Sequence, residues 1–521
     1  MAEVRSFQHQ YINGEWVEST NAPKTLDVIN SNTAQVIATV PDGSKKDAEK
    51  AILAARAAFA SWSTTPLVAR KEYIKKFMEA HKRRRAETIG WLTKELGCTA
   101  ALAESLQANF VEMHGTTLLG AIDGVNWYEA VGKVTVVKEP VGVIGAITPW
   151  NYPLNQIALK VIPALLAGCT VVLKPSKVTP CCAIIVAEAG KLQEAMHEAG
   201  VPPGVFNMVV GHECGEVLSS HPEVDLVSFT GSARAGRQIS AAAAQSLKQV
   251  RTELGGKSAA ILLDDADLQT VVPQFVAQLM NNSGQSCNAL SRMIVPESKY
   301  NEVIDIAKRV AENTVVGRSD DPKADIGPLV SQVQWDQVQS FMQKGMDEGA
   351  RLITGGPGKP AGLEGGFFAK PTILADVSNQ MTIAREEIFG PVLSIIPYSS
   401  EAEAIDVAND TIYGLNNAVA SSSMKRCIQV GSKLRSGMVM INGTYMDWEA
   451  PFGGYKQSGN AREWGLAGLD EFLVTKTINV TAKDYEEAMC PAASPKHVNL
   501  NTALLDLVVA CNTSGPGGAG L

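Results

Sequence analysis

The sequence of 521 residues lacks both an excess of positive charge and any long hydrophobic run. Its 46 lysine and arginine residues are outnumbered by 54 aspartate and glutamate residues, which gives a net charge of −8. Nucleic-acid binding usually needs a basic patch or a high isoelectric point, so we expect no nucleic-acid partner. Apolar runs such as 170–173 and 259–263 have the length of a strand and are far too short to span a membrane. We therefore expect a small-molecule substrate and no membrane association.

Paired cysteines and a secretory leader are also missing. The nine cysteines are an odd number in a long chain, and only Cys181 and Cys182 are adjacent. This pattern predicts neither a disulfide framework nor a zinc site, so we expect no bound metal. The first ten residues contain no apolar segment of the kind found in signal peptides. The expected location is therefore cytoplasmic, in a reducing compartment.

Short apolar runs alternate with amphipathic stretches through most of the chain. Strands are predicted at 141–147, 170–173, 206–210, 224–230 and 259–263, and helices at 154–167, 183–199 and 233–247. A second alternating region runs from 293 to 441, with strands near 293–296, 393–397 and 438–441. Such alternation is typical of doubly wound parallel sheets with helices on both faces. The predicted fold class is α/β, with two domains of this kind.

The two ends of the chain differ from this pattern. Asn13-Gly14, between β-favouring residues, predicts a hairpin over 11–17. At the other end, 482–521 combines Pro-rich and Gly-rich stretches around one apolar segment at 500–511. We expect this tail to be mostly disordered, or to form one short docking helix with loose flanks.

Cys287 is the candidate nucleophile because of the motifs that accompany it. A lone cysteine is usually a small buried hydrophobe. Here Cys287 follows Asn-Ser-Gly-Gln-Ser at 282–286. Upstream, Glu253 begins Glu-Leu-Gly-Gly-Lys, and Asn151 lies between two prolines in Pro-Trp-Asn-Tyr-Pro. A thiol, a carboxylate and an amide are the groups that covalent catalysis at a carbonyl carbon needs.

These motifs, in this order, resemble those of the aldehyde dehydrogenase superfamily. Four further motifs strengthen the resemblance: Lys-Pro at 174–175, Phe-Thr-Gly-Ser at 229–232, Glu-Glu-Ile-Phe-Gly-Pro at 386–391 and Pro-Phe-Gly-Gly-Tyr-Lys-Gln-Ser-Gly at 451–459. The resemblance extends over about residues 10–480 and is closest to the hydrolytic, non-acylating branch. Each motif alone is weak, and together they leave little room for another family.

The resemblance implies oxidation of an aldehyde to a carboxylic acid. A thiolate at Cys287 would attack the carbonyl carbon, with the Asn151 amide and the Cys287 backbone N–H as the oxyanion hole. Hydride transfer to NAD or NADP leaves a thioester, and Glu253 would activate the water that hydrolyses it. Two alternatives remain: a coenzyme A-acylating enzyme, which does without this glutamate, and a non-catalytic relative, which should have lost one of the three residues.

A cofactor site is implied at the turn before the helix predicted at 233–247. Small residues there allow a pyrophosphate to approach free N–H groups at the start of a helix. Lys174 and Glu387 match positions that hold the two riboses, with Phe389 beside the nicotinamide ribose. The predicted NAD or NADP site comprises Thr148, Trp150, Lys174, Ser176, Lys177, Gly211, Gly215, Phe229, Gly231, Ser232, Gly236, Leu254, Glu387 and Phe389.

Three positions depart from the family pattern. Lys177 stands where NAD-preferring members carry a glutamate, and a lysine attracts a 2′-phosphate that a glutamate repels. We therefore predict that NADP is used as well as NAD or better; a lysine pointing into solvent is the alternative. Leu466 stands where many relatives carry a second glutamate near the water channel, which predicts that Glu253 works alone. Leu159 replaces an aromatic residue that often forms one wall of the substrate tunnel.

The resemblance also indicates which residues surround the aldehyde. The implied substrate tunnel comprises Tyr152, Gln156, Leu159, Ser286, Asn288, Trp448 and Phe452. Aromatic rings can cage a quaternary ammonium group, as in betaine aldehyde dehydrogenases, or simply form an apolar lining. No arginine or lysine pair suggests a clamp for a substrate carboxylate. The predicted substrate is a medium-sized apolar or aromatic aldehyde, with a betaine-aldehyde-type or aminoaldehyde substrate as the alternative.

The resemblance divides the chain into three functional parts. Residues 1–122 and 142–252 would form the cofactor domain, 253–466 the catalytic domain, and 123–141 with 467–481 an oligomerisation element. Within that element, 134–137 and 474–480 largely alternate polar and apolar residues, as strands with one exposed face do. Exposed strand edges favour pairing with another subunit, so a homodimer or homotetramer is expected.

Overall fold

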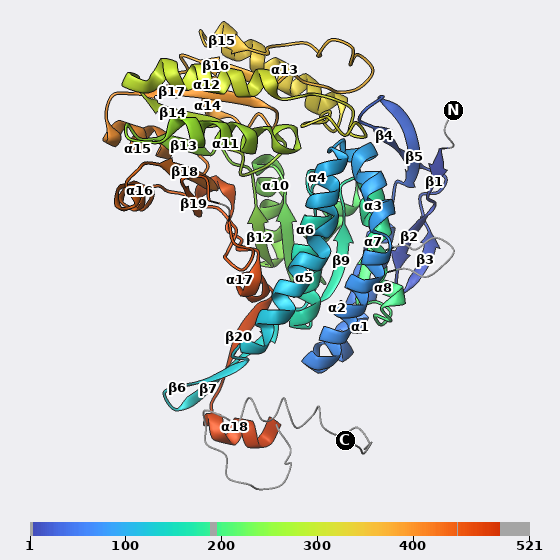
Figure 1. The fold of residues 1–521 in the computed structure, drawn as a ribbon. Coiled ribbons are helices and arrows are strands. Elements are labelled where there is room, and N and C mark those ends of the chain that lie inside the picture. The colour runs from blue at the N-terminus through green and yellow to red at the C-terminus, as the bar shows by residue number, and fades with distance from the viewer. Residues whose placement is uncertain (1–3, 188–194, 445, 490–521) are drawn as a thin grey trace, which may run out of the picture. The chain divides into compact units, whose positions relative to one another are not determined.

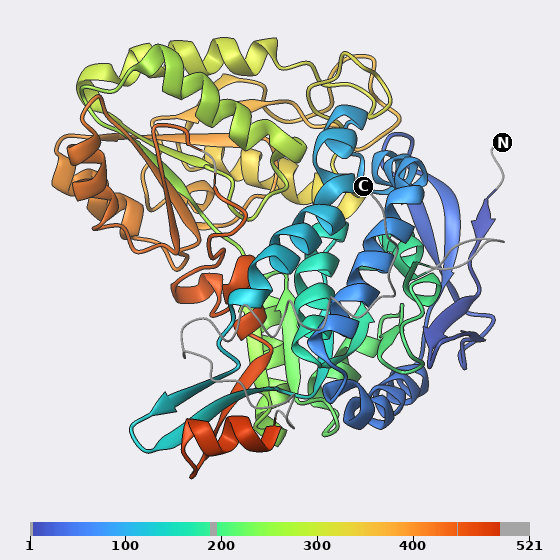
Figure 2. The same cartoon turned by 60° about the horizontal axis from the view of Figure 1, so that its bottom comes forward.

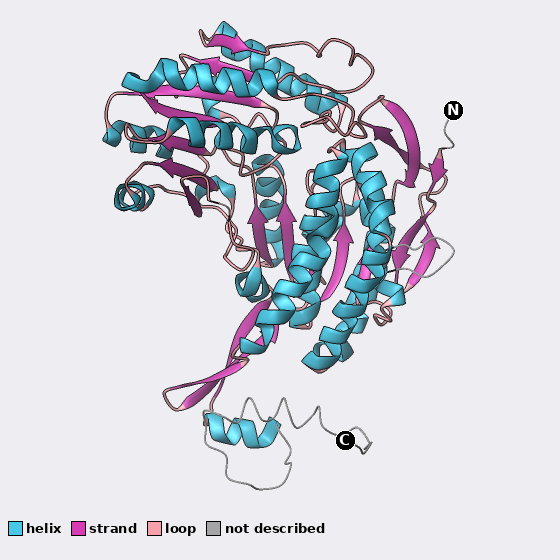
Figure 3. Ribbon diagram, in the orientation of Figure 1, coloured by secondary structure: helices cyan, strands magenta, loops and turns pink. Residues whose placement is uncertain are grey.

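The computed structural model describes residues 4–187, 195–444 and 446–489, in two compact units. The main unit holds the chain up to Val125 and from Glu139 to Val474, and the small unit holds Asn126–Lys138 and the residues from Thr475 onward. Two seven-stranded, mostly parallel sheets with helices lie in the main unit, as Figure 1 and Figure 3 show. The predicted α/β fold class is confirmed.

The first large sheet runs in the order β12-β11-β8-β9-β10-β2-β3. Its strands are β12 (Gln249–Glu253), β11 (Leu226–Thr230), β8 (Val143–Ile147), β9 (Thr170–Lys174), β10 (Phe206–Met208), β2 (His9–Ile12) and β3 (Glu15–Glu18). The first five are parallel, and the β2–β3 hairpin adds to β10 in the antiparallel sense. Asn13 and Gly14 have φ of +55° and +80°, the left-handed conformation that the predicted Asn-Gly turn requires.

Helices accompany this sheet, and α6, α7 with α8, and α10 lie where the sequence predicts helices. They are α1 (Lys45–Ser63), α6 (Pro153–Ala167), α7 (Pro180–Ala187), α8 (Ala195–Glu198), α9 (Cys214–Ser220) and α10 (Ala233–Ala243). Ser44 and Asp47 form a reciprocal capping box at the start of α1, whose Ala48, Ile52 and Ala55 are fully buried. The helix predicted over 183–199 corresponds to α7 and α8, and residues 188–194 lie outside the described residues.

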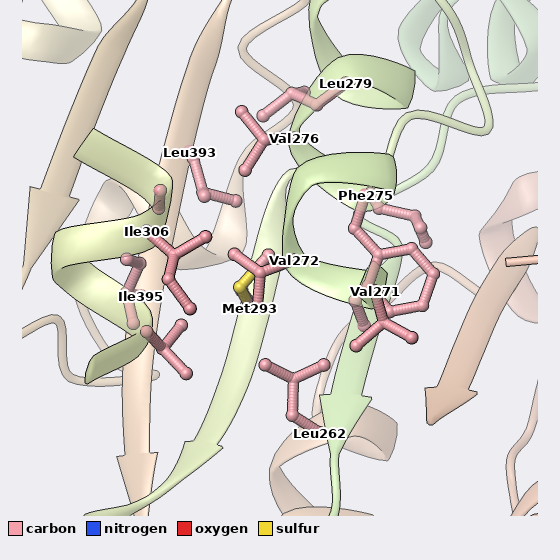
Figure 4. Packing of buried hydrophobic residues seen from close by; sticks show 14 of the residues in the cluster. Leu262, Val271, Val272, Phe275, Val276, Leu279, Met293, Ile306, Leu393 and Ile395 are labelled. Carbon is pink, nitrogen blue, oxygen red and sulfur yellow. The ribbon is translucent and has the colours of Figure 1, made fainter. Parts of the chain in front are cut away.

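The second large sheet has the order β15-β16-β17-β14-β13-β18-β19. Its strands are β15 (Arg351–Thr354), β16 (Thr372–Ala375), β17 (Val392–Tyr398), β14 (Arg292–Pro296), β13 (Ala259–Leu262), β18 (Asn416–Ala420) and β19 (Met438–Ile441). Only β15 is antiparallel to its neighbour. Figure 4 shows how Val272 and Val276 of α11 (Leu268–Met280) pack with Met293, Leu393 and Ile395 of the sheet. This apolar layer supports the segment that follows α11.

The main unit also contains a small sheet and further helices. Near the N-terminus, β1 (Arg5–Ser6), β5 (Gln35–Pro41) and β4 (Thr25–Asn30) form a small sheet. The other helices are α2 (Leu67–Arg83), α3 (Arg85–Trp91), α4 (Ala100–Ser105), α5 (Phe110–Ala121), α12 (Tyr300–Asn313), α13 (Gln332–Asp347), α14 (Thr382–Arg385), α15 (Glu401–Asn409), α16 (Met424–Gly431) and α17 (Gly465–Asp470). Among the described residues, no helix is long and apolar enough to cross a membrane.

The small unit is built on a three-stranded sheet of order β20-β7-β6. Its strands are β6 (Tyr128–Val131), β7 (Val134–Pro140) and β20 (Leu473–Ile478), and Figure 2 shows the β6–β7 hairpin beside β20. These residues overlap the predicted oligomerisation element, whose role in assembly stays a prediction. Within the tail, residues 482–489 form α18 (Ala482–Met489), and the expectation that the tail is mostly disordered or forms one short docking helix stays a prediction. The segment 500–511 lies outside the described residues.

Candidate active site

The candidate residues of the first sheet follow the carboxyl ends of its parallel strands. Asn151 lies in the loop after β8, Lys174 ends β9, Gly231 follows β11 and Glu253 ends β12. The strand order reverses between β8 and β11, since the chain continues to β9 on one side and returns to β11 on the other. In open α/β sheets, ligands bind outside the carboxyl ends of the strands at such a reversal.

A pocket with a cavity volume of about 200 Å³ opens at these strand ends. Of the predicted residues, the structure brings together in its lining Trp150, Asn151, Gln156, Gly231, Ser232, Glu253, Leu254, Cys287, Glu387 and Phe389. Sequence reasoning missed five other lining residues: Pro149, Thr230, Gly255, Gln334 and Gln337. Gln334 and Gln337 lie on α13, far from every motif, so no sequence signal pointed to them. The thiol, the carboxylate and the amide of the candidate catalytic set therefore share one cavity.

The loop before Cys287 is held in an unusual backbone conformation. Asn282, Ser283 and Gly284 have φ of +50°, +57° and +77°, three successive left-handed residues. A Cβ on Gly284 would lie 2.1 Å from the Gly390 carbonyl oxygen, so only glycine fits there. The Gln285 side chain donates to the Asn282 carbonyl (3.0 Å) and accepts from the Val330 N–H (2.9 Å). These contacts fix where the loop presents Cys287.

Asn151 is anchored to the same loop from both of its ends. Its backbone carbonyl accepts from Asn282 Nδ2 at 3.0 Å and from Gln107 Nε2 at 3.4 Å. Its own Nδ2 donates to the Gln285 carbonyl at 3.2 Å. The described residues provide this one acceptor for the amide nitrogen, which leaves the second N–H available to a ligand. Asn151 can therefore donate to an oxygen in the pocket beside Cys287.

Glu253 and Cys287 are surrounded by other acidic groups. Glu253 is 1% exposed, and the described residues provide no hydrogen-bond partner for either of its carboxylate oxygens. Burial raises the pKa of Glu253 well above its usual range; Glu463 raises it further, and Lys160 lowers it. Burial, Glu253 and Glu387 likewise raise the pKa of the Cys287 thiol. The thiol therefore stays protonated at neutral pH unless positive charge enters the pocket.

A second buried carboxylate stands near Glu253. Glu463 Oε1 lies 2.6 Å from Lys160 Nζ, and the two residues are 4% and 1% exposed. Glu463 thus supplies a buried carboxylate three positions before Leu466, and the expectation that Glu253 works alone stays a prediction. The sequence signal for the partner of Glu463 was Lys160, a single lysine within the apolar stretch 153–167.

Glu387 and Phe389 form the opposite end of the pocket. Glu387 Oε1 accepts the Gly256 N–H at 3.0 Å, and burial raises the pKa of Glu387 to about 7. Phe389, with φ of +60°, meets the Trp150 ring edge-on at 5.3 Å between centroids. Gln334 Nε2 donates to the Phe389 carbonyl at 2.9 Å and secures this strained residue.

The start of α10 is shaped to admit a phosphate group. Ser232 caps the helix by accepting the Ala235 N–H at 3.3 Å. A Cβ on Gly231 would lie 2.5 Å from the Phe229 ring, and one on Gly236 would lie 2.9 Å from Leu254. Small residues therefore keep the helix close to its strand and leave its first N–H groups facing the pocket side, where anions are favoured. This arrangement fits the pyrophosphate of a dinucleotide.

Further basic groups lie beyond the ends of β9 and β10. Lys174 Nζ donates to the Pro175 carbonyl at 3.2 Å, and its aliphatic chain lies 3.6 Å from where a Cβ on Gly215 would be. Lys177 Nζ contacts His212 Nε2, and the His212 backbone N–H donates to Asp42 at 2.9 Å. Lys177 is exposed, but it is directed toward His212 next to Gly211, and not away from the protein surface.

Aromatic and aliphatic side chains form the other wall beside the nucleophile. Leu159, Leu415, Phe452 and Trp464 form one buried cluster, against which Cys287 and Trp448 pack. The Trp464 ring lies 4.7 Å from the Trp448 ring and 4.8 Å from the Phe452 ring. Sequence reasoning missed Trp464, because no motif includes it.

The other predicted tunnel residues do not share one environment. The Tyr152 hydroxyl and the Ser286 hydroxyl are hydrogen-bonded at 2.5 Å. Gln156 lines the pocket, with its Oε1 buried. The backbone carbonyl of Asn288 accepts from Asn416 Nδ2 at 3.2 Å. Over the described ranges, no three His, Cys, Asp or Glu side chains are grouped to hold a metal ion.

The comparisons with known proteins agree with this geometry. The sequence profile of the aldehyde dehydrogenase family matches residues 16–478. The chain belongs to the aldehyde dehydrogenase family. Enzymes of this family are NAD(P)-dependent oxidoreductases, and the motifs around residues 151, 253 and 287 fall within the matched region.

Three similar proteins illustrate the range of the family. A 3-succinoylsemialdehyde-pyridine dehydrogenase from a Pseudomonas species is 48% identical over 91% of this chain and 99% of its own. A mutant of aldehyde dehydrogenase C from Pseudomonas syringae, solved with NAD+ and octanal, has a TM-score of 0.89 at 40% identity and covers 95% of this chain and 100% of that one. Betaine aldehyde dehydrogenase from Staphylococcus aureus, solved with NAD+, has a TM-score of 0.87 at 38% identity, covering 91% and 94%.

Proposed function

We propose that this aldehyde dehydrogenase converts an aldehyde to the free carboxylic acid, with Cys287 as nucleophile, Asn151 as oxyanion donor and Glu253 as general base. The observation that carries the proposal is the shared pocket, in which Glu253 is buried with both oxygens unpartnered by the described residues. A buried carboxylate with a raised pKa is suited to accept protons near neutral pH.

The residues perform the reaction in two stages. Glu253 takes the thiol proton, the Cys287 sulfur bonds to the carbonyl carbon, and the resulting alkoxide accepts from Asn151 Nδ2 and the Cys287 backbone N–H. NAD(P)+, when bound, supplies a positive charge and accepts the hydride that leaves this carbon. Glu253 then releases the thiol proton to solvent and takes a proton from water, whose oxygen attacks the thioester carbon. The carbon–sulfur bond breaks, the Cys287 sulfur leaves as a thiolate, and the carboxylic acid is released.

We assign the cofactor site to the strand ends and the start of α10. Gly231, Ser232 and Gly236 would hold the pyrophosphate, Lys174 and Glu387 the riboses, and the Trp150–Phe389 pair the nicotinamide end. The remaining members of the set are Thr148, Ser176, Lys177, Gly211, Gly215, Phe229 and Leu254. Relatives solved with NAD+ support this assignment.

We further propose that NADP is used as well as NAD or better. Lys177 and the neighbouring His212 place two nitrogen-bearing side chains beyond the ends of β9 and β10. A phosphate on the adenosine ribose can pair with Lys177, whereas a glutamate there would repel it. Steady-state rates with both cofactors test this. An NAD preference of about 100-fold or more, equivalent to about 2.7 kcal/mol, contradicts the proposal.

The proposed substrate is a medium-sized apolar or aromatic aldehyde. The wall formed by Leu159, Trp448, Phe452 and Trp464 supports it. The Pseudomonas relative is named for a pyridine-bearing semialdehyde, and the Pseudomonas syringae relative was solved with octanal. The betaine aldehyde dehydrogenase from Staphylococcus aureus is the observation behind the second candidate, a trimethylammonio-aldehyde.

We propose the domain division of the family for this chain as well. Residues 1–122 and 142–252 form the cofactor domain, 253–466 the catalytic domain, and 123–141 with 467–481 the oligomerisation element of a homodimer or homotetramer. The exposed face of the β6–β7 hairpin supports the last point, since Val131 is 49% exposed. Light scattering coupled to gel filtration checks it, and a monomer at micromolar concentration contradicts it.

Glu253→Gln provides the sharpest test of the mechanism. Thiol attack is slowed but not abolished, because the positive charge of bound NAD(P)+ favours the thiolate, and hydride loss then forms the thioester; its hydrolysis lacks a base. We expect one burst of NAD(P)H, slower than in the parent protein, then a slow steady state and a protein mass increased by the acyl group on Cys287. The control is Cys287→Ala, which should show neither burst nor adduct. Steady turnover of Glu253→Gln with coenzyme A, as fast as the parent protein, would instead support the acylating alternative.

A further inference from the structure

We propose that His212, oriented by Asp42, completes the phosphate site of Lys177 and takes up a proton from solvent when the 2′-phosphate of NADP binds, so that the preference for NADP over NAD increases as the pH falls. This inference rests on the proposed use of NADP at Lys177. It adds a second phosphate ligand and a dependence of cofactor choice on pH, neither of which follows from Lys177 alone.

His212 is placed by close contact between two backbone segments. A Cβ on Gly211 would lie 2.3 Å from the Gly43 carbonyl oxygen, so the chain after β10 lies directly against the chain after β5. The Gly43 N–H donates to the Val210 carbonyl at 2.8 Å. The Gln10 side chain bonds both polar groups of the Val210 backbone, at 2.8 and 2.7 Å. The backbone that carries His212 is therefore fixed from β2 and from the segment after β5.

Asp42 determines which ring nitrogen of His212 faces outward. Asp42 Oδ1 accepts the His212 backbone N–H at 2.9 Å and lies 3.1 Å from Nδ1 of the same residue. Burial raises the pKa of Asp42, but the His212 backbone N–H and Lys24 outweigh it and hold this pKa below its usual value. A carboxylate only accepts hydrogen bonds, so Nδ1 carries a proton and Nε2 is the nitrogen that contacts Lys177.

The contact between Lys177 and His212 has to change when an anion enters. In the contact as it stands, a neutral imidazole accepts from the Lys177 ammonium through Nε2. A protonated imidazole cannot accept there and would repel the ammonium. A phosphate oxygen accepts from both groups, so a phosphate between them removes the repulsion and favours the protonated ring. Phosphate binding and proton uptake are therefore linked, and a lower pH strengthens the binding.

Both side chains lie where the adenosine ribose is assigned. Lys177 comes three residues after Lys174, which we assign to a ribose, and His212 lies between Gly211 and Gly215 of the proposed cofactor set. The Lys174 side chain passes 3.6 Å from where a Cβ on Gly215 would be, which brings the two loops together. His212 and Lys177 are both exposed, so a phosphate can reach them from solvent.

Other charged groups lie on the elements around His212. They are the Asp42–Lys24 pair at 3.1 Å, the Glu216–Lys45 pair at 3.0 Å between α9 and α1, Glu213 next in the chain and Lys174 at the end of β9. All of them remain in His212→Gln. The difference between the parent protein and this variant therefore isolates the imidazole.

Calorimetric titration with 2′,5′-ADP and 5′-AMP, which differ by the 2′-phosphate, tests the proposal without turnover. From about pH 8 to about pH 6, the preference for 2′,5′-ADP should rise about fivefold more in the parent protein than in His212→Gln, because a charge-assisted hydrogen bond is gained. The titration of the 2′-phosphate itself, near about pH 6, is common to both proteins and cancels. In buffers of different ionisation enthalpy, the parent protein should take up about half a proton more than the variant.

Asp42→Asn tests the orienting role, because an amide can keep the contact with the His212 backbone but cannot balance the charge of a protonated ring. This variant should take up fewer protons with 2′,5′-ADP and bind 5′-AMP within about twofold of the parent protein. His221→Gln is the matched control, since His221 follows the last residue of α9, whereas His212 precedes the helix. It should behave as the parent protein does.

The outcomes separate this inference from the proposed function. A preference for 2′,5′-ADP with the same pH dependence and the same proton uptake in His212→Gln would overturn the inference and leave the use of NADP at Lys177 intact. A parent protein that gains no affinity from the 2′-phosphate anywhere in this pH range would show that the proposed use of NADP fails, and the inference with it.

Discussion

The two sides of Cys287 are built by different means. On one side lie ionisable groups: Glu253 ends β12, and Lys160 of α6 pairs with Glu463 at 2.6 Å. On the other side, Leu159, Phe452 and Trp464 meet through apolar packing. The first side acts on the carbonyl and the water, which every aldehyde shares, whereas the second contacts what differs between aldehydes. Substitutions on the first side should therefore change the rates of all aldehydes alike, whereas substitutions on the second side should change their relative rates.

Asn151→Ala should produce the largest effect, and an equal one for all substrates. Removing one oxyanion donor typically lowers kcat about 10²- to 10³-fold. The alkoxide is common to every aldehyde, so the relative rates across a panel should hold. Initial rates of NAD(P)H formation for five or six aldehydes check this. A change in their rank order would show that Asn151 also contacts the variable part of the substrate.

Leu159→Ala should change the relative rates of different aldehydes, unlike Asn151→Ala. Shortening this side chain widens the wall, so bulky aldehydes should gain about tenfold in kcat/KM relative to linear ones. The variant should also be less stable by about 2–4 kcal/mol, because a buried leucine is truncated. Thermal unfolding gives the stability, and the same aldehyde panel gives the selectivity. One common factor for all aldehydes would contradict the division into two sides.

Glu463→Gln should have the smallest effect on rate and a distinct effect on pH dependence. Glu253 must lose its proton to act as base, so activity is lost as the pH falls through its raised pKa. Glu463 contributes to that rise, and its removal lowers the pKa of Glu253. In the pH profile of kcat, the loss of activity at acidic pH should shift to lower pH by the same amount for two unrelated aldehydes. The absence of a shift would mean that another group sets this loss.

The sequence predicts the chemical side well because its residues occur in motifs at strand ends. Asn151 follows the strand predicted at 141–147, whereas Glu253, at the end of β12, and Cys287, after α11, are identified by the motifs that resemble those of the family. Parallel strands then bring these ends to one edge, so residues more than one hundred positions apart share a pocket. The assignment of catalytic roles to them stays a prediction until the variants are measured.

The substrate side is harder to predict because packing, not spacing, assembles it. Trp464 reaches the cluster through a positive φ, which no propensity argument anticipates for a tryptophan. His114 comes from α5 and Leu159 from α6, helices whose apolar faces look like ordinary core. Glu463 was overlooked for a related reason, since its importance follows from burial beside Lys160 and not from the residues around it.

Glu463 and Trp464 are consecutive residues with different neighbours: Glu463 pairs with Lys160, and Trp464 packs in the cluster that contacts Cys287. Because the backbone bridge between Phe452 and Glu463 fixes the segment's position, deletion of one residue between them would bring Trp464 to the position of Glu463 and Gly465 to that of Trp464. Grafting 451–466 from another family member would likewise transfer proton handling and substrate choice together. For protein engineering, an exchange of this segment changes proton handling and substrate choice together, and only point substitutions separate the two properties.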